Sequence, residues 1–211
     1  PTATAHHLLC EYSSAPLGMD SPRPRFSWWM DDPRPGAAQT GYQLQVASEE
    51  AFSGDSLMWD TGEVESSASV FVEYDGYTLT SITRYWFRVR LRDHQHQWGE
   101  WSDASWFETA LLTGDEWSAS WIGPTDDETD DGGPPPYLRT RFTTNGAVAR
   151  ARLYVAARGL MELSLNGSLV GDDVLVPGWT DYNKRCQYLT YDVTGLVTSG
   201  ENVLGAVLGD G

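Results

Sequence analysis

The chain has 211 residues, with 30 Asp and Glu against 14 Lys and Arg, which gives a formal net charge of −16. Such a field repels polyanions and the sequence has no basic stripe to offset it, so nucleic-acid binding is excluded. The 12% aromatic content, with 21 Gly and 11 Pro, favours short strands and turns over long helices. No stretch of 18 apolar residues and no signal peptide is visible, so we expect no membrane partner, and the localisation stays open between cytoplasm and secretion.

The acidic balance has a second implication, because Lys184 is the only lysine beside thirteen arginines. Proteins that work in concentrated salt have this composition, because salt screens the repulsion between surface carboxylates. The Debye length, beyond which such charges no longer repel one another appreciably, is roughly 3 Å at 1 M salt. A halophilic source is the leading explanation. An acidic enzyme from an organism whose codon usage favours arginine is the alternative.

Short apolar runs separated by turns cover residues 8–112 and predict a first domain, residues 1–112, of fibronectin type III or immunoglobulin kind. In the run Tyr85–Leu91, alternation places Tyr85 and Phe87 on one face and Trp86 and Arg88 on the other. The expected strands include Phe26–Trp29, Tyr42–Val46, Leu57–Trp59, Ser69–Val72, Tyr85–Leu91 and Ala104–Glu108.

The motif Trp98–Ser102 resembles the Trp-Ser-x-Trp-Ser box near the last strand of some fibronectin type III domains. Arg88, Arg90 and Arg92 alternate on one strand face, where they are placed to intercalate with Trp98 and Trp101 through cation–π contacts. A sugar-stacking platform is one interpretation. A packed surface ladder explains the same residues without a ligand.

Residues 113–136 form the expected linker, because Asp126–Pro136 is acidic and rich in Gly and Pro with nothing to bury. A solvated charge run explains its carboxylates better than a calcium loop, which needs fixed Gly and Glu positions. His6 and His7 are expected at an unstructured terminus, and His94 and His96 in a loop without a third metal ligand. Cys10 and Cys186 are expected to be two thiols and not a disulfide.

A second all-β domain is predicted for residues 137–211, where strand-like runs return in the order of a jelly roll. Asn166-Gly167 lies between alternating runs and is the strongest short signal for a type I′ hairpin, because both central residues need positive φ. The run of strands ends at residue 211 before a jelly roll is complete, so we expect a truncated sandwich with an unpaired edge.

These segments together resemble the N-terminal region of bacterial α-L-rhamnosidases. The resemblance is carried by the stretches Leu8–Trp28, Gly41–Ser48, Leu57–Val64, Trp117–Gly123 and Asn166–Tyr191. It implies a fibronectin type III-like domain followed by a carbohydrate-binding-like domain of a larger enzyme that removes terminal L-rhamnose by inversion. It also implies that the catalytic carboxylates lie in a later helical toroid, outside these residues. No catalytic residue is therefore assigned.

Sugar binding needs an aromatic face for the apolar side of the ring and planar polar groups for its hydroxyls. One turn and the hairpin beside it offer such a set for a rhamnose-containing glycan: Trp179, Asp181, Tyr182, Asn183 and Asn166. Some members of the resembled family bind rhamnose through calcium, and Asp172 and Asp173 are the carboxylates that would ligate it here. In the alternative interpretation Trp179 and Tyr182 plug the end of the sandwich while Asp181 caps a turn.

Three functional hypotheses remain open. The chain is the non-catalytic, carbohydrate-binding N-terminal part of an α-L-rhamnosidase whose partner is the missing C-terminal catalytic domain of the same chain. Alternatively, both domains are a structural scaffold that braces that catalytic domain, or the chain is an independent adhesion-like module, as Trp98–Ser102 alone would suggest. No cofactor is required in any of them.

The charge imbalance generates a prediction about salt. Because about thirty acidic groups repel one another in the compact state, the thermal midpoint of the chain should rise between low and molar KCl. Circular dichroism melts in a KCl series measure this. A flat or falling midpoint would contradict halophilic adaptation and leave codon usage as the explanation.

Overall fold

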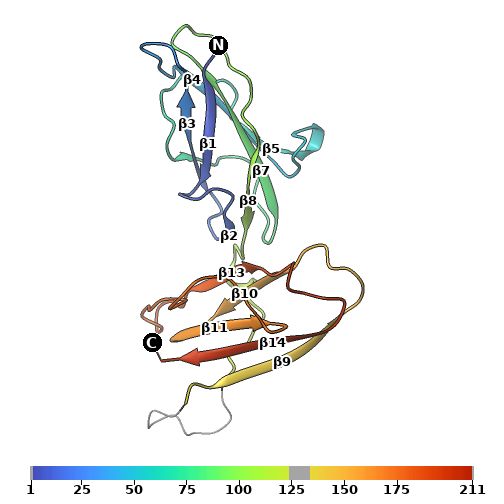
Figure 1. The fold of residues 1–211 in the computed structure, drawn as a ribbon. Helices are drawn as coiled ribbons and strands as arrows, with labels where there is room; N and C mark the ends of the chain where they lie inside the picture. The colour runs from blue at the N-terminus through green and yellow to red at the C-terminus, as the bar shows by residue number, and fades with distance from the viewer. Residues whose placement is uncertain (1, 124–133, 211) are drawn as a thin grey trace. The chain divides into compact units, whose positions relative to one another are not determined.

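A computed structural model describes residues 2–123 and 134–210, so the acidic run 126–131 lies outside the described residues. The regular structure there is almost entirely β-strand, with two 3₁₀ turns at Gly54–Ser56 and Gly114–Glu116. Contacts divide the chain into two compact units, Pro1–Trp117 and Ser118–Gly211 (Figure 1). None of the described helices is long and apolar enough to span a membrane.

The first unit is a sandwich of two sheets, as expected for an immunoglobulin-like or fibronectin-like domain. One sheet has the order β1-β3-β6 and the other β2-β8-β7-β4-β5. The strands are β1 (Thr4–Cys10), β2 (Leu17–Met19), β3 (Arg25–Asp31), β4 (Gly41–Ala47), β5 (Leu57–Asp60), β6 (Val72–Glu73), β7 (Arg84–Arg92) and β8 (Ser105–Thr109).

Strand β7 shows why this unit folds as it does. Its side chains alternate between buried and half-buried along all nine residues, so Tyr85, Phe87, Val89 and Leu91 face the core. These residues pack with aromatic side chains from the opposite sheet and from β8, and Phe26 lies 4.7 Å from Phe87 between ring centroids. The predicted two faces of this strand are confirmed.

Two local predictions are wrong. His6 and His7 do not lie in an unstructured terminus but in β1, which pairs antiparallel with β3 and stacks His7 on Trp29 at 4.2 Å. The sequence signal was hidden because His7 takes a φ of 51° in an irregular stretch of the pairing, which breaks the period-2 pattern. The run Ser69–Val72 is mostly loop, with a left-handed φ of 57° at Phe71, and β6 comprises only Val72 and Glu73.

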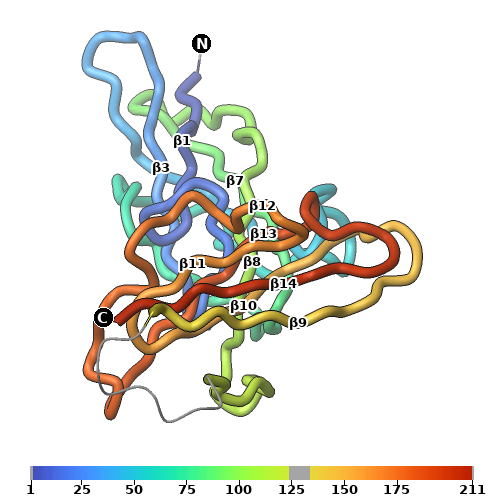
Figure 2. The backbone as a smooth tube through the Cα atoms, turned by 60° about the horizontal axis from the view of Figure 1, so that its bottom comes forward, coloured from blue at the N-terminus to red at the C-terminus, as the bar shows by residue number. Residues whose placement is uncertain are grey.

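The second unit also has two sheets. A four-stranded sheet has the order β12-β11-β14-β9, and β10 and β13 form a two-stranded sheet (Figure 2). The strands are β9 (Tyr137–Thr144), β10 (Arg152–Ala156), β11 (Leu160–Leu165), β12 (Ser168–Leu169), β13 (Tyr188–Asp192) and β14 (Gly200–Gly209). The Asn-Gly hairpin is confirmed: Asn166 and Gly167 have φ of 53° and 84°, and Leu165 pairs with Ser168.

The core of the second unit is less completely covered than that of the first. Met161, Leu163 and Leu165 of β11 are buried, but the apolar residues that pack against them from β10, β13 and β14 are only half-buried. Strand β9 is mostly exposed along its length. The sheet of four strands is therefore matched by a sheet of only two strands, and part of the apolar interior stays accessible to solvent.

The cysteines are both free thiols, as expected from the sequence. Cys10 is fully buried, and this burial raises the pKa of its thiol far above the ordinary value. Cys186 is half-buried and donates weakly to the Ala157 carbonyl at 3.5 Å.

A charged network fixes the loop after β7 to the segment that follows β3. Arg34 donates from Nε to Asp32 at 2.8 Å and from Nη2 to Asp93 at 2.7 Å, and both carboxylates are inaccessible to solvent. The hydrogen bonds from Arg34 lower the pKa of Asp32 to about 2. The same guanidinium and the backbone N–H of Gln97 lower the pKa of Asp93.

This network predicts the acid sensitivity of the first unit. A carboxylate with a lowered folded-state pKa stabilises the fold above its unfolded pKa near 3.8, and that stabilisation is lost as the pH falls toward 2. We expect the thermal midpoint to fall over this window, and to fall less steeply in Arg34→Gln, which starts from a lower midpoint at pH 6. Parallel pH dependences of wild type and variant would show that the network contributes nothing to acid sensitivity.

Candidate functional site

The arginine and tryptophan side chains on the outer face of the first unit form the expected ladder. Between guanidinium carbon and ring centroid, Arg88 lies 4.4 Å from Trp101, and Arg90 and Arg92 lie 4.9 and 5.9 Å from Trp98. Arg88 also lies over Phe52 at 4.4 Å. Because guanidinium groups already contact these aromatic faces, the arrangement supports a packed surface ladder over a sugar-stacking platform.

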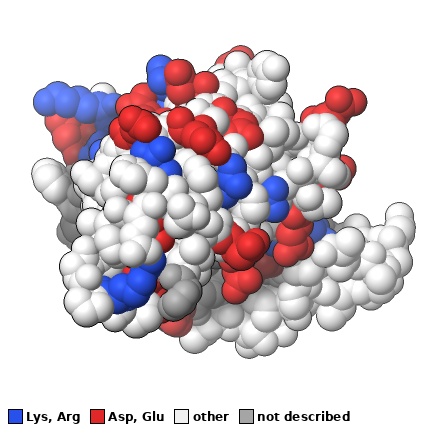
Figure 3. Space-filling view, turned by 90° about the horizontal axis from the view of Figure 1, so that it is seen from above, with Lys and Arg blue, Asp and Glu red and all other residues white. Residues whose placement is uncertain are grey.

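Glutamines and carboxylates complete that surface. Arg88 and Arg90 donate to the side-chain oxygens of Gln45 and Gln43, and Arg92 pairs with Glu65 at 3.0 Å. The donors and acceptors of the ladder are thus largely bound to one another. The face of the molecule drawn in Figure 3 has basic side chains interspersed among acidic ones.

In the second unit four of the five candidate sugar residues lie on the long loop between β12 and β13, and Asn166 lies in the turn between β11 and β12. Trp179 is 76% exposed, so it does not plug the sandwich end as the alternative interpretation supposed. Asp181 caps the following turn by accepting the N–H of Asn183 at 3.2 Å, and its other oxygen faces Lys184 Nζ at 3.3 Å. The carbonyl of Asp181 accepts the N–H groups of Lys184 and Arg185. These contacts close the turn, and it presents the indole outward.

Tyr182 anchors this turn to the rest of the unit. Its hydroxyl accepts the backbone N–H of Gly159 at 2.8 Å, immediately before β11 begins. Thr180 is buried and donates to the Arg185 carbonyl at 2.6 Å. Tyr182 and Thr180 thus position the loop, while Trp179 and Asn183 remain available to a ligand.

Asn166 takes part in a separate structural network. Its amide nitrogen donates to the Leu196 carbonyl at 2.9 Å and to Asn202 Oδ1 at 2.8 Å, and its side-chain oxygen accepts the Val203 N–H at 2.8 Å. Asn202 is fully buried and also binds the backbone of Thr198 and Gly200. The polar groups of Asn166 are therefore committed to the fold.

Asp172 and Asp173 lie beside Tyr191. Burial raises the pKa of Tyr191 to about 12, and the hydrogen bond to Asp173 and the negative charges of both carboxylates add to this. Among the described residues no group of three or more His, Cys, Asp or Glu side chains is arranged to hold a metal ion. Calcium ligation at this pair would need further oxygen ligands, because Ca²⁺ takes six to eight.

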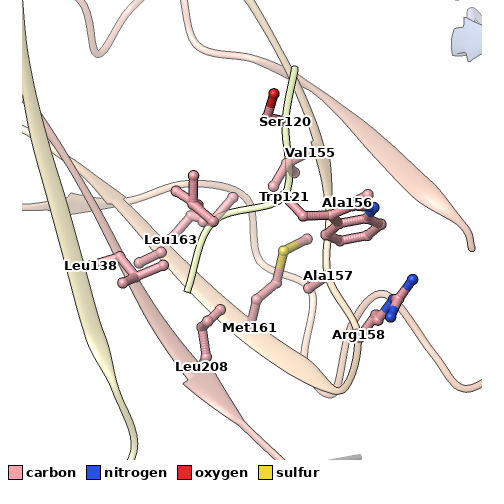
Figure 4. Close-up of a pocket in the computed structure, with 12 residues that line it drawn as sticks. Ser120, Trp121, Leu138, Val155, Ala156, Ala157, Arg158, Met161, Leu163 and Leu208 are labelled. Atoms are coloured by element: carbon pink, nitrogen blue, oxygen red, sulfur yellow. The ribbon is translucent and has the colours of Figure 1, made fainter. Parts of the chain in front are cut away.

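One feature of the second unit was not anticipated. A pocket of about 320 Å³ opens between the linker residues Ser120–Ile122 and the half-covered core. Figure 4 shows Trp121 beside Arg158, whose guanidinium carbon lies 5.0 Å from an indole centroid, with Met161 below the indole and Leu163 to its left. The sequence indicated Trp117–Gly123 only as part of the family resemblance. It did not predict a pocket there, because a tryptophan in a linker belongs to no periodic pattern that would show what it packs against.

The described residues thus define a protein of two consecutive β-sandwich units. Residues 5–113 match the family described as the Rha78A-like, N-terminal immunoglobulin domain, and residues 146–211 match the α-L-rhamnosidase N-terminal domain. The chain belongs to this family of N-terminal rhamnosidase regions. The resemblance stated from the sequence is confirmed.

Similar proteins are much longer. An α-L-rhamnosidase of Alteromonas sp. (strain LOR) is 40% identical over 205 residues, which cover 93% of this chain and 22% of that protein. The structure of the α-L-rhamnosidase from Dictyoglumus thermophilum aligns with 99% of this chain and 25% of its own, at 37% identity and a TM-score of 0.90. The Streptomyces avermitilis α-L-rhamnosidase complexed with L-rhamnose aligns with a TM-score of 0.53 at 30% identity, over 99% of this chain and 22% of its own. The chain therefore spans about a quarter of the length of these relatives.

Proposed function

We propose that the chain is the non-catalytic N-terminal part of an α-L-rhamnosidase, a hydrolase that releases terminal L-rhamnose from glycosides. The observation that carries this proposal is the alignment of nearly the whole chain with one quarter of the Dictyoglumus thermophilum enzyme. Both matched families describe N-terminal domains, which supports a location of the catalytic carboxylates outside these residues. The two units then act as accessory domains of that part.

An independent adhesion-like module has less support. It rested on Trp98–Ser102, and the two tryptophans of this motif pack against arginines of β7 in the ladder. The same residues fall within the matched immunoglobulin domain.

The proposal predicts that the 211-residue chain hydrolyses no rhamnoside, whereas the complete product of its gene does. Release of p-nitrophenol from an aryl α-L-rhamnoside is the measurement, with heat-inactivated protein as the blank. Activity of the purified chain above that blank would place the catalytic groups within these residues. An inactive complete product would remove the assignment as a rhamnosidase.

A more specific role that we propose for the second unit is weak carbohydrate binding. It is favoured by the exposed indole of Trp179, which lies on a turn that Asp181 caps and Tyr182 anchors. A sugar ring would stack on this indole, and Asn183 and the carboxylate of Asp181 would bind its hydroxyls. Calcium ligation by Asp172 and Asp173 is a separate part of this proposal. A purely structural scaffold is the competing role.

One stacked ring with a few hydrogen bonds gives a dissociation constant on the order of 0.1–1 mM, so the titration must extend to tens of millimolar L-rhamnose. NMR titrations with calcium, and then with chelator, should show saturable shifts that Trp179→Ala and Asp181→Ala each weaken. Trp121→Ala removes another exposed indole of the same unit and serves as the matched control. A linear response in both conditions would favour the scaffold.

A further inference from the structure

A second surface of the same loop lies apart from the Trp179 turn. Leu169, Val174 and Leu175 are 61%, 82% and 74% exposed, although each is a large apolar residue. Leu169 and Val174 border a cavity of about 120 Å³ whose walls include the buried core residues Met161 and Leu163. We refer to Leu169, Val174, Leu175 and this cavity as the apolar notch.

Backbone hydrogen bonds tie the notch to β11. The Val170 N–H donates to the Leu163 carbonyl at 3.0 Å, and the Met161 N–H donates to the Val176 carbonyl at 2.9 Å. Both ends of the segment 170–176 are therefore tied to one buried strand. The exposed side chains of Val174 and Leu175 lie between these two attachment points.

The backbone conformation of this segment also indicates a functional surface. Leu175 has a φ of 57°, in the left-handed region that side chains other than glycine avoid. Gly171 has a φ of 74°, and a Cβ there would lie 2.5 Å from Cε1 of Tyr191. The fold thus holds a strained segment whose apolar side chains face solvent, and such strain is concentrated at functional surfaces.

The rim of the notch is acidic. Glu162, Asp172 and Asp173 line the cavity together with the apolar residues and are exposed. An apolar cavity of about 150 Å³ accommodates benzene in another protein, so a volume of about 120 Å³ suits one aliphatic side chain. The complementary surface is therefore an apolar side chain flanked by arginine or lysine.

We propose that the apolar notch is the docking surface of this unit for the part of the longer rhamnosidase that follows residue 211, which contributes an apolar side chain with basic neighbours. This inference rests on the proposed function. It identifies that part as the occupant because about three quarters of the similar α-L-rhamnosidases of Alteromonas sp. and Dictyoglumus thermophilum lies outside the aligned region. A contact of this kind positions the accessory unit against the catalytic part.

The test uses the complete gene product and compares Val174→Asp/Leu175→Asp with the matched variant Val70→Asp, which alters an exposed valine of the first unit. Hydrogen exchange should show segment 169–176 protected in the complete wild-type protein, and more than tenfold faster exchange in the double variant. The thermal midpoint of the double variant should be lower by at least about 3 °C. Val70→Asp should change neither quantity, and Val174→Leu should retain the protection.

Three outcomes would overturn the inference. One is equal exchange of 169–176 in the wild type and the double variant. The second is protection that the isolated chain acquires only as it dimerises, which would assign the notch to a second copy. The third is protection that appears only with L-rhamnose, which would assign it to a sugar. Rhamnosidase activity is assayed on the same samples to separate the two proposals. An inactive protein with a protected notch contradicts only the proposed function. An active protein with an unprotected notch contradicts only the docking.

Discussion

The register of β11 is the constraint on which the candidate surfaces of the second unit depend. This strand pairs with β12 and β14, so Met161, Leu163 and Leu165 all face the core. Its backbone also holds both ends of segment 170–176, and Gly159 just before it donates to the Tyr182 hydroxyl. A slip by one residue would turn the apolar side chains of β11 to solvent and displace both anchors at once.

Much of the fold was predictable because it follows from local rules. The alternation from Tyr85 to Leu91 determined both faces of β7, and positive φ at Asn166 and Gly167 is what the Asn-Gly hairpin requires. The arginine and tryptophan ladder was also predictable, since side chains two residues apart share a strand face. Strand β1 was missed because its irregular pairing at His7 removes that periodicity.

The candidate site was less predictable, because its geometry depends on contacts between distant residues. Asn166 seemed suited to a sugar hydroxyl, yet Asn202 and Val203, thirty-six and thirty-seven positions later, take up its amide. Asp181 was correctly expected to cap a turn, which is a local property of aspartate. The exposure of Trp179 and Val174, by contrast, depends on how the loop is tied to β11, and no short-range pattern encodes it.

The loop between β12 and β13 thus presents two surfaces of different chemistry. Around Trp179 an aromatic face lies beside a carboxylate and an amide, which suits a small polar ligand with an apolar side. Around Val174 aliphatic side chains surround a small cavity whose polar side chains are three carboxylates and the phenol of Tyr191, which is hydrogen-bonded to Asp173. This cavity has no exposed aromatic face on which a sugar ring could stack, whereas a protein side chain brings apolar area and cations together. Substitutions at Trp179 and at Val174 therefore alter different surfaces, whereas Asp172 and Asp173 belong to both the proposed calcium site and the rim of the notch.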